Sequence, residues 1–308
     1  MIKIKNTLFI VLSLLVILIT FLNFDRIWER LSSINKPAPS TVIKEANEYQ
    51  KKETFYFVKQ TDNYTPNSFN DLMNIFYSVL NQGWDDFTFY CPVEYKECLK
   101  DVVKLSYDEI LLSDINNYVH PYNSYAKIKI LYDDAGEVTI KINHQYSKEE
   151  IEKIDADIDS LITSQTNSEM TTKEKIRALH DYIINETKYD TRRASKEESK
   201  YDSARINGVL YDHYAICSGY TDLMAVILTK LNVPNFKVAS ATHVWNAVYV
   251  DNTWLHLDLT WDDPVSTSGK DILDHSYFLI TNDRLEELDK ENKNEHIFNK
   301  GTYYELTY

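Results

Sequence analysis

One cysteine, one histidine and one aspartate follow each other in the C-terminal part of the chain in an order that suits nucleophilic catalysis. Cys217 is followed by Ser-Gly-Tyr, His243 by Val-Trp-Asn, and Asp258 by Leu-Thr-Trp-Asp-Asp-Pro. A thiolate is a strong nucleophile, but a free cysteine, with a pKa of about 8.5, needs a partner in order to ionise at neutral pH. A histidine can accept the thiol proton, and a carboxylate can hold the imidazole in the required tautomer. The three residues predict thiol chemistry if the fold brings them together.

The residues after Cys217 predict a helix. Apolar side chains recur at three- and four-residue spacing as far as Leu231, and Asn232 and Pro234 end the pattern. Cys217 is therefore expected in or before the first helical turn, where unpaired N–H groups and the helix dipole favour a thiolate. Gly219 leaves the backbone bare beside the thiol, as the close approach of a substrate would require.

Two strands that form a hairpin are predicted next, over residues 243–250 and 253–261, with Asp251-Asn252 as a two-residue turn. If the residues that flank this turn pair, His243 and Asp258 become diagonal neighbours on one face. Their backbones are then roughly 6–8 Å apart and their side chains are within reach. A three-residue turn would place them on opposite faces. The other face, rich in Val and Leu, is expected to pack on the core.

Each of these residues also has a structural interpretation. An isolated cysteine is usually a small buried hydrophobe, and an isolated histidine usually makes structural hydrogen bonds. The agreement of helix start, strand face and diagonal partner favours catalysis over those alternatives. Asp262 and Asp263 precede Pro264 and are interpreted as turn formers. His180, on a helix predicted to start with a capping box at Thr171, is interpreted as structural.

The combined motifs resemble those of the transglutaminase-like superfamily, in particular its bacterial transglutaminase/protease-like branch. The resemblance extends from about Thr171 to Asp283 and includes C-x-G-Y, H-x-W-N and D-x-T-W-D-D in this order. It implies an α+β, papain-like core in which a helix bearing Cys217 packs on an antiparallel sheet bearing His243 and Asp258. These residues would be the nucleophile, the general base and acid, and the orienting carboxylate.

The resemblance also implies a reaction. Cys217 would attack a glutamine carboxamide or a peptide carbonyl, and the thioester would pass its acyl group to an amine or to water. Protein or peptide substrates, including cell-wall or surface proteins, are the expected partners. The candidates for lining the substrate cleft are Gly219, Tyr220, Trp245 and Trp254. The alternative is a catalytically silent module of the same fold for cell-surface protein interaction, since the family contains such members.

Composition restricts the partners further. The net charge of the 308 residues is −14, and no basic stripe is present, which argues against nucleic acid as a partner. Of the three cysteines, Cys91 and Cys98 could close a small disulfide loop or stay reduced, and either outcome leaves Cys217 unpaired. No sequence has the spacing of a zinc motif, so no metal and no other cofactor is predicted.

The N-terminus predicts a membrane anchor. Residues 6–24 carry no charged side chain, and a helix over them is roughly 28 Å long, about the thickness of a bilayer core. Lys3 and Lys5 on the short side predict that the N-terminus is inside and the bulk of the chain is extracytoplasmic. The alternative is a cleaved secretory signal, which would leave a secreted protein, but the apolar run is long for one and no small-x-small cleavage site follows it.

The predicted organisation begins with a cytoplasmic stub, a transmembrane signal-anchor and a juxtamembrane linker, and continues with an N-terminal α/β region of unknown role and a transglutaminase-like domain. The boundaries are 1–5, 6–24, 25–50, 51–165 and 166–308. In the α/β region we expect strands at 54–58 and 86–91, helices at 68–80, 94–104 and 147–163, and a hairpin at 125–132 and 137–143. The polar stretch 187–211 is expected to be a mobile surface loop.

Overall fold

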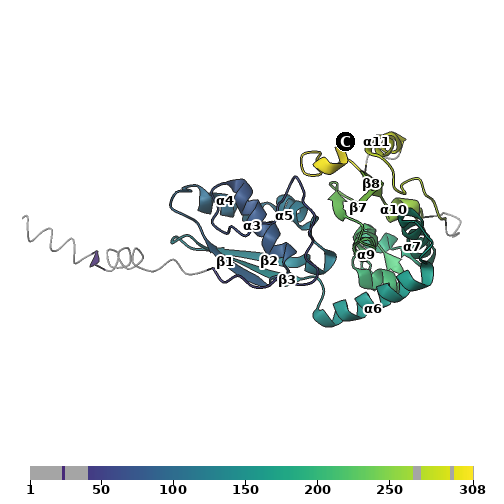
Figure 1. Ribbon diagram of the computed structural model, residues 1–308, viewed down its shortest axis with the longest axis horizontal. Coiled ribbons are helices and arrows are strands. Elements are labelled where there is room, and N and C mark those ends of the chain that lie inside the picture. The colour runs from purple at the N-terminus through teal and green to yellow at the C-terminus, as the bar shows by residue number, and fades with distance from the viewer. Residues whose placement is uncertain (1–22, 25–40, 266–271, 292–294, 308) are drawn as a thin grey trace, which may run out of the picture.

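The protein has an α+β fold, seen in a computed structural model that describes residues 23–24, 41–265, 272–291 and 295–307. Figure 1 shows an N-terminal sheet with its helices beside a C-terminal group of elements that contains Cys217. The predicted transmembrane segment lies outside the described residues, apart from its last two. The helices within the described ranges include none with the length and apolarity needed to cross a membrane.

The N-terminal group is a three-stranded antiparallel sheet in the order β1-β3-β2, with three helices against one face (Figure 1). In chain order its elements are α3 (Phe69–Asn81), β1 (Asp86–Tyr90), α4 (Cys98–Tyr107), α5 (Glu109–Asn116), η1 (Pro121–Asn123), β2 (Tyr125–Tyr132) and β3 (Glu137–His144). The predicted hairpin is confirmed, with Ile130 paired with Ile140. The predicted helix at 68–80 is confirmed as α3, whose N-cap Ser68 accepts a hydrogen bond from the backbone N–H of Asp71.

The strand predicted for residues 54–58 is wrong. Phe55 and Val58 are buried, but the backbone N–H of Tyr56 donates to Glu305 Oε1 at 2.8 Å. A side chain from the C-terminal end of the chain thus takes the place of a partner strand. The segment packs in the core without joining a sheet.

Cys91 and Cys98 form a disulfide, with their Cα atoms 5.7 Å apart. Helix α4 begins at Cys98, so the helix predicted for residues 94–104 starts later and ends later than expected. Residues 92–97 form the loop that the disulfide closes. Cys217 remains as the free cysteine of the described chain.

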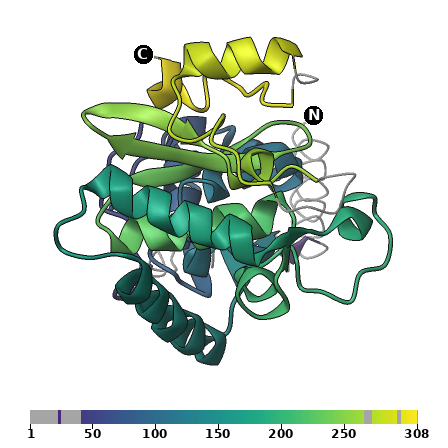
Figure 2. The same ribbon diagram turned by 90° about the vertical axis from the view of Figure 1, so that its right-hand side faces the viewer.

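The C-terminal group contains a second antiparallel sheet, in the order β6-β7-β8, which lies beside helix α9. Its elements are α6 (Lys148–Gln165), α7 (Thr172–Glu186), β4 (Lys188–Tyr189), α8 (Thr191–Ala194), η2 (Gly208–Asp212), β5 (Tyr214–Ala215), α9 (Cys217–Lys230), β6 (Asn235–Ala239), β7 (Val244–Val250), β8 (Thr253–Leu257), α10 (Leu259–Asp262), α11 (Asn282–Glu291) and η3 (Tyr304–Thr307). The capping box at Thr171 is present at the start of α7. Figure 2 shows α11 and the C-terminal segment lying across one edge of this sheet.

The second sheet is buried on both faces. Val248 and Leu257 belong to the hydrophobic cluster that contains α9, as the sequence predicted for the Val- and Leu-rich face. On the other face, Trp245 and Ala247 belong to a cluster with the N-terminal group. The hydrophobic core therefore includes residues from both sides of the predicted boundary at 165.

The stretch 187–211 is a surface loop only in its middle. Residues 191–198 are exposed, but β4 pairs in parallel with β5, and the buried Ser203 donates to Asp190 Oδ2 at 2.7 Å. The prediction of a surface loop is therefore wrong for the two ends of this stretch. Both ends are anchored beside the start of α9.

Candidate active site

Cys217 is the first residue of α9, where the sequence places it. Its predecessor Ile216 is the N-cap residue, and its apolar side chain makes no cap hydrogen bond. The N–H groups of the first helical turn are therefore not capped by a side chain of the N-cap residue. Because these groups and the helix dipole stabilise negative charge, the position favours a thiolate and an oxyanion next to it.

Gly219, a candidate for the substrate cleft, serves the packing of α9. A Cβ atom at this position would lie 2.5 Å from the carbonyl oxygen of Ser203. The same carbonyl accepts a hydrogen bond from the backbone N–H of Ile216 at 2.8 Å. The bare backbone at Gly219 therefore faces the chain's own residues 203–205, and this close approach orients the beginning of the helix that bears Cys217.

The hairpin of β7 and β8 has the predicted register. Asp251 and Asn252 have φ angles of 53° and 63°, and positive values at both positions are what a two-residue type I′ turn requires. Val250 pairs with Thr253 across this turn. His243 and Asp258 lie just beyond the ends of the strands, and His243 Nε2 is 2.5 Å from Asp258 Oδ2.

The side chain of Cys217 lies close enough to the His243 imidazole to raise its pKa. Because Nε2 of this ring is occupied by Asp258, the nitrogen that faces the thiol is Nδ1. Burial disfavours the charged imidazole, but the Asp258 carboxylate and then Cys217 outweigh it and raise the pKa of His243 to about 10. The structure thus brings together the three residues that the motifs singled out.

Asp258 ends the hairpin by capping the next helix. Its Oδ1 accepts hydrogen bonds from the backbone N–H groups of Thr260 at 2.9 Å and Trp261 at 3.3 Å. The strand predicted to continue to Trp261 therefore stops at Leu257, and α10 begins. Burial favours the neutral carboxyl, but the imidazole of His243, with a further contribution from His296, holds the pKa of Asp258 well below its usual range.

His296 is a member of the site that the sequence analysis missed. Its Nε2 lies 2.9 Å from Asp258 Oδ2, and its Nδ1 lies 2.7 Å from Asp289 Oδ1. The His296 side chain is fully buried. Asp258 Oδ2 therefore has two imidazole partners, His243 and His296. No motif surrounds His296, which lies 38 residues after Asp258, and only the packing of the C-terminal segment against the hairpin reveals its partner.

Tyr189 is a second residue without an assigned role in the sequence analysis. Strand β4 places it beside Ala215, two residues before Cys217. Burial, and then the electrostatic influence of Cys217, raise the pKa of the Tyr189 phenol to about 12. The phenol therefore stays protonated at neutral pH.

The two tryptophan candidates lie in different environments. Trp245 is fully buried and stacks on the ring of His243 with 5.7 Å between centroids. Its Nε1 donates to His256 Nδ1 at 2.9 Å, so it is held in place behind the His243 imidazole. Trp254 pairs with Tyr249 near the turn of the hairpin, at the opposite end of β8 from Asp258.

Asp262 and Asp263 are buried hydrogen-bond acceptors, which corrects their interpretation as turn formers. Asp263 Oδ2 accepts a hydrogen bond from the hydroxyl of the buried Tyr220 at 2.5 Å. Asp262 Oδ1 accepts from the backbone N–H of Tyr277 at 2.8 Å, and its Oδ2 lies 3.1 Å from His180 Nε2. Tyr220, another candidate for the cleft, is thereby part of the support beneath the site.

Comparisons with known proteins give one family match and two distant structural similarities. Residues 159–259 match the family model of the transglutaminase-like superfamily. No curated protein matches the chain. Among solved structures, a TGase is similar at 16% identity and a TM-score of 0.34. The match covers 56% of this chain and 63% of the TGase chain, which is less than two thirds of the length of the TGase. A candidate cysteine protease from Cytophaga hutchinsonii is similar at 14% identity and a TM-score of 0.28, over 50% of this chain and 69% of that one.

Proposed function

We propose that the protein is a thiol enzyme that transfers acyl groups from protein or peptide amides, since residues 159–259 match the family model of the transglutaminase-like superfamily. The observation that carries the proposal is the grouping of Cys217, at the N-terminus of α9, with the hydrogen-bonded pair of His243 and Asp258. In this proposal Cys217 is the nucleophile, His243 is the general base and acid, and Asp258 orients the imidazole.

The first half of the proposed reaction acylates the enzyme. In the resting enzyme His243 Nδ1 already holds the proton of the thiol, and the thiolate sulfur forms a bond to the carbonyl carbon of the substrate amide. The oxygen that becomes negative is stabilised by N–H groups at the start of α9, with the phenol of Tyr189 as a second donor. The C–N bond then breaks, and Nδ1 passes its proton to the departing ammonia or amine, which leaves a thioester on Cys217.

The second half releases the acyl group. A primary amine or a water molecule passes a proton to His243 Nδ1 and attacks the thioester carbon. The carbon–sulfur bond breaks, and the proton stays on His243 Nδ1 beside the thiolate that leaves. Attack by an amine gives a transglutaminase and attack by water gives a cysteine protease or amidase, so the outcome depends on how well the site excludes water.

Product analysis tests the proposal. The purified chain is incubated with a glutamine-bearing protein and a fluorescent primary amine, and peptide cleavage is followed in parallel by mass spectrometry. We expect one of the two products to form with the wild-type chain and to be absent with Cys217→Ala, whereas Ser218→Ala retains activity. Equal product from Cys217→Ala would contradict the proposal. If neither product forms on a broad set of substrates and the thiol reacts at an ordinary rate, the non-catalytic interaction module becomes the better explanation.

We further propose that the enzyme is anchored by residues 6–24 and acts outside the cytoplasm on protein or peptide substrates, including cell-wall or surface proteins. The uncharged segment after Lys3 and Lys5 supports this, as does the disulfide between Cys91 and Cys98, a bond that persists in oxidising compartments. Alkaline extraction of membranes should leave the full chain in the pellet and release a chain that starts at residue 41. Release of both would contradict the anchor.

A further inference from the structure

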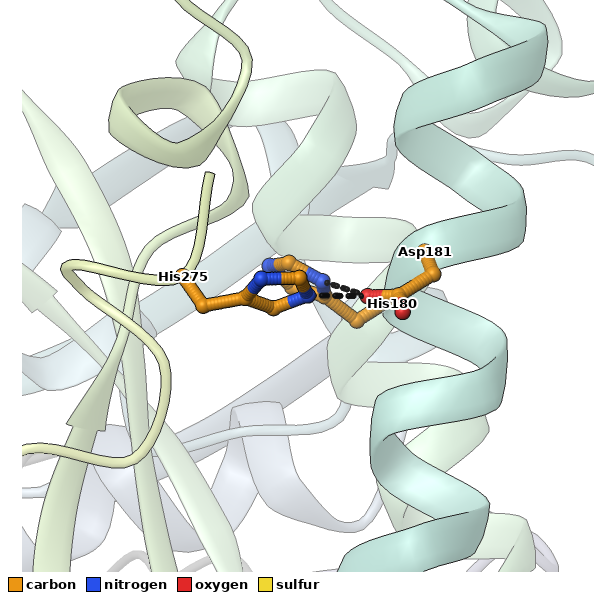
Figure 3. Close-up of side chains that lie close together, drawn as sticks. All are labelled: His180, Asp181 and His275. Carbon is orange, nitrogen blue, oxygen red and sulfur yellow. Dashed lines mark hydrogen bonds and ion pairs between the residues drawn. The ribbon is translucent and has the colours of Figure 1, made fainter. Parts of the chain in front are cut away.

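A second cluster of side chains lies at α7, with no residue in common with the Cys217 series. Figure 3 shows the imidazoles of His180 and His275 both directed at the carboxylate of Asp181. His180 Nδ1 is 2.8 Å and His275 Nε2 is 2.7 Å from the same oxygen, Asp181 Oδ1. His275 lies 94 residues after Asp181, so no local spacing in the sequence could indicate that these side chains meet.

The other nitrogen of His180 is held by a buried carboxylate. His180 Nε2 lies 3.1 Å from Asp262 Oδ2, and both side chains are fully buried. Asp262 is itself oriented by the backbone N–H of Tyr277. A histidine whose second nitrogen donates to a carboxylate presents the lone pair of its first nitrogen outward, and this arrangement is typical of histidines that bind metal ions.

His180 Nδ1 and Asp181 Oδ1 are 2.8 Å apart, and both atoms can act as ligands of a cation. His275 Nε2 faces the same oxygen, so a divalent ion at this point gains a second imidazole.

We propose that His180 Nδ1, the Asp181 carboxylate and His275 Nε2 bind a divalent transition-metal ion, zinc above all, with water as the fourth ligand. Two imidazoles, one carboxylate and one water are a tetrahedral ligand set that suits Zn²⁺. The three ligand atoms lie within 4.8 Å of one another. Zinc ligands at about 2.0–2.1 Å from the ion are roughly 3.3 Å apart, so Asp181 needs to withdraw by only about half an ångström.

The position is accessible, and an ion there would brace the fold. The side chains of Asp181 and His275 are 28% and 27% exposed, which admits the ion and its water. The ion would join α7 to the segment around His275. Through the contact of His180 with Asp262 it would also connect to α10, whose N-cap residue is Asp258. The inference does not depend on acyl transfer, because it requires neither a substrate nor a reactive thiol.

Calorimetric titration of Zn²⁺ into the full-length Cys217→Ala protein tests the proposal. This background removes the thiolate, which would otherwise be a second zinc ligand beside His243. We expect one ion per chain at micromolar affinity or tighter, and no binding of Ca²⁺, which requires about six to eight oxygen ligands. Adding His275→Ala should weaken zinc binding by at least about tenfold, because even the loss of a residue that only hydrogen-bonds to a metal ligand has an effect of this size. The matched control, His144→Ala at the end of β3, should leave the affinity unchanged.

Two results would overturn the proposal: no zinc binding to the Cys217→Ala protein, or the same affinity after His275→Ala. Anomalous diffraction from zinc-soaked wild-type crystals needs no variant and so remains informative if His275→Ala misfolds. A peak between His180, Asp181 and His275 is expected. A peak only at His243, Asp258 and His296, the other set of three close ligand side chains in the described chain, would overturn the proposal as well.

Discussion

At the scale of single residues, the charge on His243 determines the reactivity of the thiol in the proposed mechanism. The pKa of this imidazole is raised from 6.5 to about 10, so the imidazolium persists through neutral pH beside Cys217. The raised pKa also stabilises the fold. This contribution is complete below about pH 6.5 and is lost as the pH rises through about 10, because in between the folded chain keeps a proton that the unfolded chain has already released.

The first prediction concerns the rate at which iodoacetamide alkylates Cys217. An imidazolium next to the sulfur stabilises the thiolate, so we expect fast alkylation that persists down to about pH 6. In His243→Ala the rate should rise only near pH 8.5, as it does for an ordinary thiol. Rates measured from pH 5 to 10 on both proteins provide the comparison, and identical pH profiles would show that the two side chains are not coupled.

At the scale of elements, the C-terminal segment after α11 completes the site by delivering His296. This imidazole bridges the carboxylates of Asp258 and Asp289. Asp258 is therefore oriented from two sides, by His243 at one end of the hairpin and by a segment outside the matched family region 159–259. We interpret His296 as a positioning residue, since it acts on the thiol only through Asp258 and His243.

The second prediction follows from this bridge. In His296→Ala, Asp258 loses a hydrogen-bond partner, so His243 is held less firmly. Alkylation of Cys217 at pH 6 should then slow by about tenfold, the size of effect seen when a residue that orients a metal ligand is removed. The rate at pH 9 should change little, since the thiol ionises there without help. His296→Gln, which keeps one N–H donor, should recover part of the rate at pH 6. A uniform loss at both pH values would instead indicate a purely structural role.

The third prediction concerns the contact between α9 and residues 203–205. In Gly219→Ala the new Cβ would meet the Ser203 carbonyl at 2.5 Å, so the helix must shift. Overpacking of this kind costs about 1–3 kcal/mol, measured as the free energy of unfolding by denaturant. Gly301→Ala is the control, because its Cβ meets only the end of the Asn299 side chain, at 3.2 Å. Equal effects of the two substitutions would argue against the packing role of Gly219.

At the scale of the whole molecule, a buried lysine links the N-terminal part of the chain to the second sheet. The Nζ of Lys51 donates to the backbone carbonyl of Asn235 in β6 at 2.5 Å. Burial lowers the pKa of this amine from 10.5 to about 8, with Lys237 also lowering it and Glu53 opposing the shift. The charged amine is therefore held in the core at neutral pH at a cost in stability.

The fourth prediction uses the sign of that shift. Between about pH 8 and 10.5 the unfolded chain keeps a proton on Lys51 that the folded chain has lost, so the stability of the wild type rises with pH by up to about 1.4 kcal/mol per unit. Lys51→Met should lack this increment. Below about pH 8, the difference in the free energy of unfolding between the two proteins should not change with pH. Denaturant unfolding at pH 7, 8, 9 and 10 measures it, with the exposed Lys52→Met as control. If the free energies of unfolding of the wild type and Lys51→Met changed in parallel with pH, the assignment of this pH dependence to Lys51 would be contradicted.

The sequence by itself determined the features that depend on neighbours along the chain. Helix α9 starts at Cys217 because apolar side chains recur with helical spacing after it, and the hairpin register follows from a two-residue turn whose residues tolerate positive φ. Together these local rules are sufficient to place Cys217, His243 and Asp258 as candidates.

Only the tertiary structure decided the rest. The pairing of His296 with Asp258, of His275 with Asp181, and of Glu305 with the backbone of Tyr56 joins residues 38, 94 and 249 positions apart. Contacts over such separations depend on how whole helices and strands pack. The spacing of apolar residues along the sequence carries no information about this packing. The same limit explains why a strand was predicted at 54–58. Phe55 and Val58 do enter the core, but the partner for the backbone of Tyr56 is a side chain from the C-terminal end of the chain.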